Sequence, residues 1–326
     1  MPAAGAEPAR GGPTDPTAAA MDVLGELAER AVPLGPLTTY RVGGPAAIFV
    51  RATSRDDLVV VAEALRRSRL PLLIVGRGSN LLVSDVGFRG IALSVAALTD
   101  SFEIDTSEQT VRAGAAVLLP VLARQIAAAG LTGFEWAVGV PGSIGGAVRM
   151  NAGGHGSDMA ACLTEATVGE LGTPPAGTAR DRVRTVAAAE LGLRFRGSAL
   201  GTQSVVLDAR LQLRTGDRAA AEREIGEIVA WRRANQPGGQ NAGSVFVNPV
   251  PGEVSAGELI DAAGLRGRRI GSAAVSDKHA NFIQADEGGS ADDVHELMQI
   301  VRREVEDRTG YALRSEIRLI GFGDEG

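Results

Sequence analysis

Apolar positions recur at two different spacings in the first third of the chain. Thr53 and Ser54 carry hydroxyls that can cap a helix, and the apolar residues that follow keep helical spacing: Leu58, Val61, Ala62 and Leu65. A continuous apolar run occupies residues 70–75, and a shorter one occupies residues 48–50. Both runs are typical of buried strands. The pattern therefore predicts a strand, a helix and a second strand in succession.

The middle of the chain changes from helical to alternating patterns. A helix is predicted from about residue 118 to residue 129, where Gly130 can adopt the left-handed conformation that ends a helix. Short alternating segments broken by Gly and Pro fill residues 166–213, which favours antiparallel strands. A charged helix is predicted over residues 216–236, before Pro237, and we expect a lobe boundary near its end.

The last ninety residues predict two capped helices and a strand. Ser255 with Glu258 can open a helix that closes at Gly264, and a second pair, Ser290 with Asp293, can open another that closes near residue 310. Residues 313–322 then alternate as a terminal strand.

Composition and charge exclude several classes of protein. With 44% hydrophobic and 22% charged residues the chain can bury a core. No apolar run approaches the roughly 20 residues needed to cross a bilayer. The net charge of -6 without basic runs argues against nucleic acid or an anionic membrane as a partner. A single cysteine, Cys162, and three dispersed histidines predict no metal site.

Two glycine-rich loops stand out among the 43 glycines, GRGSN at 76–80 and GVPGSIGG at 139–146. Neither is a Rossmann loop, because Leu81 continues the first into an apolar strand-like segment rather than a helix. No Walker sequence and no GxSxG occurs. Bare backbone N–H groups in such loops can bind phosphate, so the pair could hold a diphosphate; the alternative is two ordinary tight turns.

Several motifs in order resemble one enzyme family. They are TTYRVGGPA from residue 38, GRGSNLLV from 76 and VGVPGSIGGAVRMNAG from 138, followed by AGSVFVNP from 242, VSDKHA from 275 and EIRLIG from 316. Together they span residues 33–321 and resemble the UDP-N-acetylenolpyruvoylglucosamine reductases (UDP-N-acetylmuramate dehydrogenases), in the shorter, type II-like form.

The resemblance implies an α+β fold, with an FAD-binding domain of the vanillyl-alcohol-oxidase (PCMH) type and a smaller C-terminal α/β substrate lobe. We expect a disordered tail over residues 1–20 and the FAD domain over 21–214, divided near residue 80. The substrate domain would occupy 215–326, with the strand at 311–322 returning to the active site.

The implied reaction takes hydride from NADPH onto non-covalent FAD and then reduces the enolpyruvyl ether of a UDP-sugar to UDP-N-acetylmuramate, a peptidoglycan precursor. The resemblance implies a cytoplasmic enzyme of small molecules that needs no nucleic acid, membrane or obligate protein partner.

The same resemblance assigns roles to individual side chains. Arg196 would hold the substrate carboxylate, Ser244 would donate a proton to carbon, and Glu316 would stabilise the enolate-like intermediate. Predicted substrate-binding residues are Asn248, Lys278 and His279. Predicted cofactor-binding residues are Arg41, Gly76, Arg77, Gly78, Ser79, Asn80, Leu81, Gly139, Val140, Pro141, Gly142, Ser143, Gly145, Gly146, Asn151 and Gly153.

Strand alternation around the catalytic candidates predicts which charges share a face. A period of two places Arg194 beside Arg196, and it places Arg314 and Arg318 beside Glu316. The alternative for both sets is a row of solvent-exposed charges without a catalytic role.

The sequence departs from the family pattern at His155, where tyrosine is common, at Phe195, also usually tyrosine, and at Val247, often lysine. Two other functions stay open: another oxidase or dehydrogenase of the same flavin superfamily, and a non-catalytic nucleotide-binding protein. The second alternative predicts loss of one of the three catalytic side chains, and all three are present.

Overall fold

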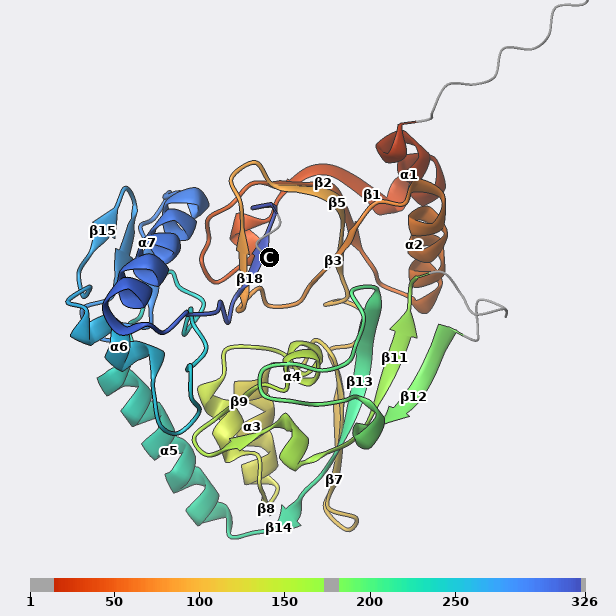
Figure 1. The fold of residues 1–326 in the computed structure, drawn as a ribbon. Coiled ribbons are helices and arrows are strands. Elements are labelled where there is room, and N and C mark those ends of the chain that lie inside the picture. The colour runs from red at the N-terminus through yellow and green to blue at the C-terminus, as the bar shows by residue number, and fades with distance from the viewer. Residues whose placement is uncertain (1–14, 173–181, 324–326) are drawn as a thin grey trace, which may run out of the picture.

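The computed structural model describes residues 15–172 and 182–323, which form three packed lobes (Figure 1). In the first lobe, a four-stranded sheet has the order β1-β2-β5-β3. Its elements are α1 (Pro16–Leu24), β1 (Ala28–Pro33), β2 (Pro45–Arg51), α2 (Arg55–Ser68), β3 (Leu72–Val75) and β5 (Phe88–Ser94). The predicted strand–helix–strand unit is confirmed as β2, α2 and β3, with β5 pairing in parallel between the two strands.

Local capping sets the start of α2. The Ser54 side chain accepts from the Asp57 backbone N–H at 3.2 Å, while the Asp57 carboxylate accepts from the Ser54 N–H at 3.0 Å. This reciprocal pair satisfies N–H groups that have no partner inside the helix.

The expected tail over residues 1–20 is wrong from Asp15 onward; residues 1–14 lie outside the described part of the chain. The Asp15 carboxylate caps α1 by accepting from the Thr17 N–H at 3.0 Å, and Pro16 occupies a favourable first helical position. Small alanines let α1 pack closely against α2, and Ala20 is fully buried.

The middle lobe contains a five-stranded antiparallel sheet with the order β12-β11-β13-β7-β6. Its strands are β6 (Phe102–Asp105), β7 (Thr110–Gly114), β11 (Leu163–Glu170), β12 (Val183–Ala187) and β13 (Ser204–Gln212), which confirms the antiparallel pattern predicted for 166–213. Two helices, α3 (Leu119–Ala128) and α4 (Ile144–Met150), pack with this sheet. Two-residue strands pair as β8 (Leu131–Thr132) with β14 (Arg214–Thr215), and β9 (Gly153–Gly154) with β10 (Ser157–Asp158). Short 3₁₀ turns lie at Gly25–Leu27, Gly35–Leu37, Glu135–Gly139, Met159–Ala161 and Ala188–Glu190.

Helix α5 (Arg218–Asn235) packs on the middle lobe. Its buried side chains Ala221, Ile225 and Ile228 belong to the same core as α3 and the five-stranded sheet. The boundary expected at residue 215 therefore precedes a helix whose apolar face is buried against the middle lobe, and we place the boundary after α5. The division expected near residue 80 falls inside the first lobe, because β5 belongs to its sheet and extends to Ser94. We therefore place this division after residue 94.

The C-terminal lobe packs two capped helices on a small sheet. It contains α6 (Ala256–Ala262), β15 (Arg269–Ile270), β16 (Ala273–Val275), β17 (Ile283–Ala285) and α7 (Ala291–Thr309). Ser255 and Ser290 cap the two helices by accepting from the N–H groups of Glu258 and Asp293, as the sequence predicts.

The expected strand over 313–322 is shorter in the structure. Only β18 (Arg318–Ile320) is regular, and it pairs in parallel with β4 (Leu81–Val83), so the chain end returns to the first lobe.

Side-chain hydrogen bonds also join the first and C-terminal lobes. The buried Tyr40 hydroxyl donates to the Ile283 carbonyl at 3.1 Å. The Asp85 carboxylate accepts from the Ser290 hydroxyl and from the N–H of Ala291 at the start of α7. In the ranges that the structure describes, no helix combines the length and the apolar character needed to span a membrane.

Candidate active site

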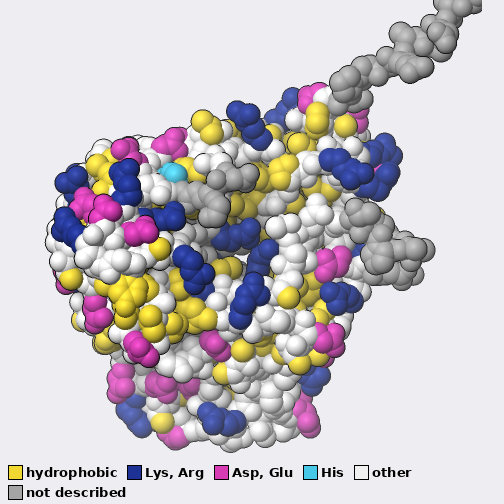
Figure 2. Space-filling view, in the orientation of Figure 1, with side chains coloured by type: hydrophobic (Ala, Val, Ile, Leu, Met, Phe, Trp, Pro, Cys, Tyr) yellow, Lys and Arg dark blue, Asp and Glu magenta, His cyan; other side chains and the backbone are white. Residues whose placement is uncertain are grey.

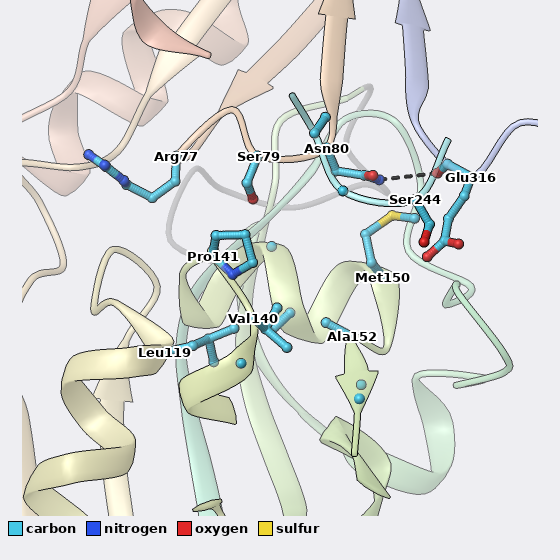
Figure 3. A pocket seen from close by; sticks show the side chains of 18 of the residues that line it. Arg77, Ser79, Asn80, Leu119, Val140, Pro141, Met150, Ala152, Ser244 and Glu316 are labelled. Atoms are coloured by element: carbon cyan, nitrogen blue, oxygen red, sulfur yellow. Dashed lines mark hydrogen bonds between the residues drawn. The ribbon is translucent and has the colours of Figure 1, made fainter. Parts of the chain in front are cut away.

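A pocket of about 550 Å³ lies where the three lobes meet (Figure 3). Its wall includes both glycine-rich loops, the ends of α4 and α5, the segment 241–244, and the segment that leads into β18. Segments far apart in sequence therefore meet in one cavity.

The first glycine loop follows β3 and enters β4, and all six predicted residues from Gly76 to Leu81 line the pocket. Gly78 has φ +62°, and a Cβ there would lie 2.2 Å from the Leu37 carbonyl oxygen. Glycine is needed here because the contact is with backbone, which cannot move aside cheaply.

The second predicted loop is a loop only up to Ser143, because the residues that follow form α4. The segment from Gly139 to Ser143 lines the pocket, and so does Gly146. No atom outside its own helix would meet a Cβ at Gly146, so bare helical backbone borders the cavity at this position.

The three predicted catalytic residues all line this pocket. Arg196 and Glu316 form an ion pair, with 2.6 Å between Nε and Oε1, and their side chains are 27% and 18% exposed. The Arg196 Nε–H is not aligned for a hydrogen bond, whereas Nη1 donates to the Gly153 carbonyl at 3.0 Å. The Glu316 backbone N–H donates to Val245 at 2.8 Å, which brings Glu316 next to Ser244 (Figure 3).

The predicted strand around Arg196 is wrong. Arg196 has φ +55° and lies in a turn between Gly192 and Gly197, closed by paired backbone hydrogen bonds between Arg194 and Gly197. Arg194 is directed back to the Ser198 carbonyl instead of sharing a face with Arg196. The glycines break the alternation, and the turn directs Arg196 alone toward Glu316.

Burial and the charge of Arg196 act in opposite directions on the pKa of Glu316. Desolvation raises the pKa of its carboxyl above the usual range, and the nearby Arg196 charge opposes that rise. Of the two cations predicted beside it, Arg318 lines the pocket whereas Arg314 is exposed. Arg196, from another lobe, takes the place that we expected flanking residues to fill.

Arginines outnumber acids on the pocket wall. Among the residues that the structure describes, the wall has a single carboxylate, that of Glu316, against five arginines: Arg77, Arg149, Arg196, Arg232 and Arg318. Figure 2 shows dark blue side chains gathered around the central hollow. Burial lowers the pKa of Arg149, Arg232 and Arg318, so these cations lack much of their hydration. The pocket is built for an anionic ligand.

Sequence reasoning did not assign Arg149 and Arg232 to the site. Arg149 lies inside the motif at 138–153, but its neighbours give no sign that it faces the cavity. Arg232 belongs to a charged helix in which most arginines are solvated. Trp231, beside it, also lines the pocket and packs edge-on against His155, with 5.3 Å between ring centroids.

Three predicted cofactor-binding residues do not line the pocket. Arg41 is exposed. Gly145 faces Ala115, whose Cβ would lie 2.8 Å from an added Cβ. Asn151 ends α4 with φ 40°, and its amide is engaged within the middle lobe, donating to Asp158 and accepting from the Ala160 N–H.

None of the three predicted substrate-binding residues lines the pocket. Asn248 accepts from the Ala256 N–H at the start of α6. The Lys278 ammonium donates to the Arg233 carbonyl near the end of α5, where a cation also interacts favourably with the helix dipole. His279 accepts from the Asn281 N–H and packs on Phe282, which does line the pocket.

Known proteins resemble the chain in both of its main parts. The sequence model of an FAD binding domain matches residues 46–169, and that of the UDP-N-acetylenolpyruvoylglucosamine reductase C-terminal domain matches residues 235–320. UDP-N-acetylenolpyruvoylglucosamine reductase 2 of Symbiobacterium thermophilum is 42% identical over 296 residues, covering 90% of this chain and 92% of its own. The reductase of Gloeobacter violaceus is 42% identical over 295 residues, covering 90% and 96%.

A solved structure agrees with these relatives. The crystal structure of UDP-N-acetylenolpyruvylglucosamine reductase from Thermus caldophilus has a TM-score of 0.73 and 33% identity, covering 90% of this chain and 98% of that one. The chain thus belongs to the UDP-N-acetylenolpyruvoylglucosamine reductase family.

Proposed function

We propose that the protein uses NADPH and FAD to reduce the enolpyruvyl ether of UDP-N-acetylglucosamine to the lactyl ether of UDP-N-acetylmuramate. The observation that carries this proposal is the meeting of Arg196, Ser244 and Glu316 in one pocket with both glycine loops. Because both proposed small-molecule substrates are cytoplasmic metabolites, we assign the protein to the cytoplasm.

The pocket residues fit FAD. Backbone N–H groups of the two glycine loops can face a diphosphate, and the open side of Gly146 leaves room for a ligand against bare backbone. The excess of arginine suits the negative charge of the cofactor. Bound FAD would supply hydride transfer between the nicotinamide and the vinyl group.

Arg196 and Ser244 would carry out the steps that follow hydride addition. Hydride added to the terminal vinyl carbon leaves negative charge on the adjacent carbon and on its carboxylate. Arg196 would bind that carboxylate, because a planar guanidinium can donate two parallel hydrogen bonds to it. Ser244 Oγ would donate a proton to the adjacent carbon.

Glu316 would support the same intermediate in its protonated form. Burial raises the pKa of this carboxyl group and so lowers the cost of protonating it, and the protonated group could donate a hydrogen bond to the developing enolate oxygen. Binding of the substrate carboxylate to Arg196 would weaken the ion pair between Arg196 and Glu316. Protonation of Glu316 would then become more favourable.

Absorbance spectroscopy of the purified protein tests the proposed function. We expect the purified protein to carry a yellow, non-covalent flavin spectrum, and we expect that spectrum to bleach with NADPH under anaerobic conditions. The bleached protein should recover its colour when the enolpyruvyl UDP-sugar is added. If the protein cannot be reconstituted with flavin, the proposal is wrong. If it is bleached by NADPH but indifferent to the UDP-sugar, another reductase activity is indicated.

A substitution at Gly146 tests whether FAD occupies the open side of α4. We expect Gly146→Ala to weaken FAD binding about tenfold or more, because an added methyl group against a packed ligand costs about 1–3 kcal/mol. The free energy of unfolding of the apoprotein should stay equal or rise by up to about 1 kcal/mol, since alanine favours helix. Titration of the apoprotein with FAD and urea unfolding measure the two effects.

Gly226→Ala is the matched control. Gly226 also lies in a helix with open space beside it, but it does not line the pocket. FAD affinity should be unchanged in this variant. Equal FAD affinity in both variants would mean that the cofactor does not contact α4 at Gly146.

A further inference from the structure

Four arginines in the pocket have no acidic partner among the described residues: Arg77, Arg232, Arg149 and Arg318. The last two share a second cavity. Arg149, on α4, and Arg318, on β18, line both the main pocket and a smaller cavity of about 90 Å³ beside the glycine loops. Arg149 Nη1 donates only to backbone carbonyls, those of Gly201 at 2.8 Å and Ser204 at 3.4 Å. The side chain of Arg318 makes no hydrogen bond or ion pair within the described ranges. We call these two residues the Arg149–Arg318 pair.

Holding the pair together costs free energy in the ligand-free protein. Burial lowers the pKa of both guanidinium groups, and the charge of Arg318 lowers that of Arg149 further. Glu316, whose carboxylate is the one that the described part of the chain places on the pocket wall, is engaged with Arg196. Two close, partly desolvated cations are therefore left without compensation, which an anionic ligand would provide.

The pair lies at the reacting end of the pocket. Arg318 follows Glu316 by two residues, and its backbone N–H donates to the Asn80 carbonyl at 2.9 Å, at the end of the first glycine loop. Arg149 lines the same smaller cavity as Arg318. The flavin ring has to reach this end of the pocket if hydride is to pass to a substrate held by the catalytic residues. The diphosphate already has the glycine loops as partners.

We propose that the Arg149–Arg318 pair binds the pyrimidine edge of the flavin ring and stabilises the negative charge that the ring gains on reduction. This inference rests on the proposed function for the presence of FAD. A hydride carries one proton and two electrons, so the ring gains one negative charge while the nicotinamide leaves as a cation. Two guanidinium groups beside N1 and the C2 carbonyl would offset that charge and shift the equilibrium toward reduced flavin.

The midpoint potential of the bound FAD tests the pair. In the reconstituted holoenzyme, Arg318→Gln and Arg149→Gln should each shift the two-electron equilibrium about tenfold toward oxidised flavin, a potential about 30 mV more negative. Sulfite adds to the flavin ring and leaves the same negative charge, so its binding should also weaken about tenfold. Arg303→Gln, on the exposed face of α7, removes the same charge at a distance and should change neither quantity.

A conservative substitution distinguishes the effect of the lost charge from the effect of an altered local structure. Arg318→Lys keeps a cation and should keep the equilibrium within about threefold of wild type, and an equal shift in the Lys and Gln variants would contradict the proposal. An unchanged potential with much weaker FAD binding would assign the pair to the diphosphate and overturn it. An unchanged potential with a raised KM for the UDP-sugar alone would assign the pair to the substrate and overturn it as well.

A wrong substrate assignment can be distinguished from a wrong role of the Arg149–Arg318 pair. The potential and the sulfite titration need no UDP-sugar. If the substrate assignment were wrong and the pair were correct, both shifts would appear without any reduction of the UDP-sugar.

Discussion

Replacing Ser244 with alanine is expected to slow reduction of the enolpyruvyl UDP-sugar by about 10²–10⁴-fold while leaving flavin reduction by NADPH intact. The magnitude is that of a lost general acid. The two half-reactions differ because only the second one places a proton on carbon. Ser244 lies beside Glu316 in the pocket, and its hydroxyl makes no hydrogen bond with another described residue, so its removal disturbs no contact that holds the fold (Figure 3).

Anaerobic stopped-flow measurements separate the two half-reactions. Flavin bleaching by NADPH gives the first rate, and the return of colour after addition of the UDP-sugar gives the second. Ser107→Ala, in the exposed turn after β6, is the control and should retain both rates. An equal loss of both rates in Ser244→Ala would contradict the role of proton donor.

Local signals explain how much of the fold the sequence predicts. Ser54, Ser255 and Ser290 each cap the predicted helix, because a cap depends only on residues within one turn of the helix start. Gly130 and Gly310 follow helix ends in the left-handed conformation, for the same local reason. Such positions can be recognised without knowledge of tertiary contacts.

Alternation in short segments is a weaker guide. The segment around Arg196 alternates like a strand, yet Gly192 and Gly197 allow a turn that satisfies its backbone differently. The contact that matters, between Arg196 and Glu316, joins residues 120 positions apart. No local pattern reports such a contact, although the ordered family motifs identify both residues.

Contacts between lobes account for the residues that sequence reasoning placed differently. Lys278, the only lysine, connects the C-terminal lobe to the end of α5 instead of lining the pocket. Arg149, Arg232 and Arg318 face the pocket only because three lobes pack around it. A sequence gives their charge, whereas partial burial without an acidic partner requires the assembled fold.

Replacing Glu316 with alanine is expected to slow reduction of the UDP-sugar by about 10²–10³-fold, the range for a lost hydrogen-bond donor to a developing oxyanion. Alanine removes both the carboxyl group that would donate to the enolate oxygen and the group that faces Arg196. NADPH should still reduce the flavin in this variant. Stopped-flow traces of the second half-reaction measure the loss, and a second rate within threefold of wild type would exclude Glu316 from the chemistry.

The pH dependence of stability provides a second test of Glu316. Its pKa in the folded protein lies above the ordinary value of 4.5, because burial outweighs the charge of Arg196. Ionisation is therefore less favourable in the folded state, and the stability that the neutral carboxyl contributes below pH 4.5 is lost as pH rises through the raised folded pKa. Each unit of difference between the folded and unfolded pKa corresponds to about 1.4 kcal/mol.

Glutamine does not titrate, so the Glu316→Gln variant does not lose this stability. Its free energy of unfolding should therefore increase relative to that of wild type as pH rises from 4.5. Urea unfolding of both apoproteins at a series of pH values measures the difference. A difference that does not change with pH would mean that Glu316 titrates alike in folded and unfolded chains. A difference of the opposite sign would mean that the Arg196 charge outweighs burial and lowers the pKa of Glu316 in the folded protein, which would contradict the hydrogen-bond role proposed for its protonated form.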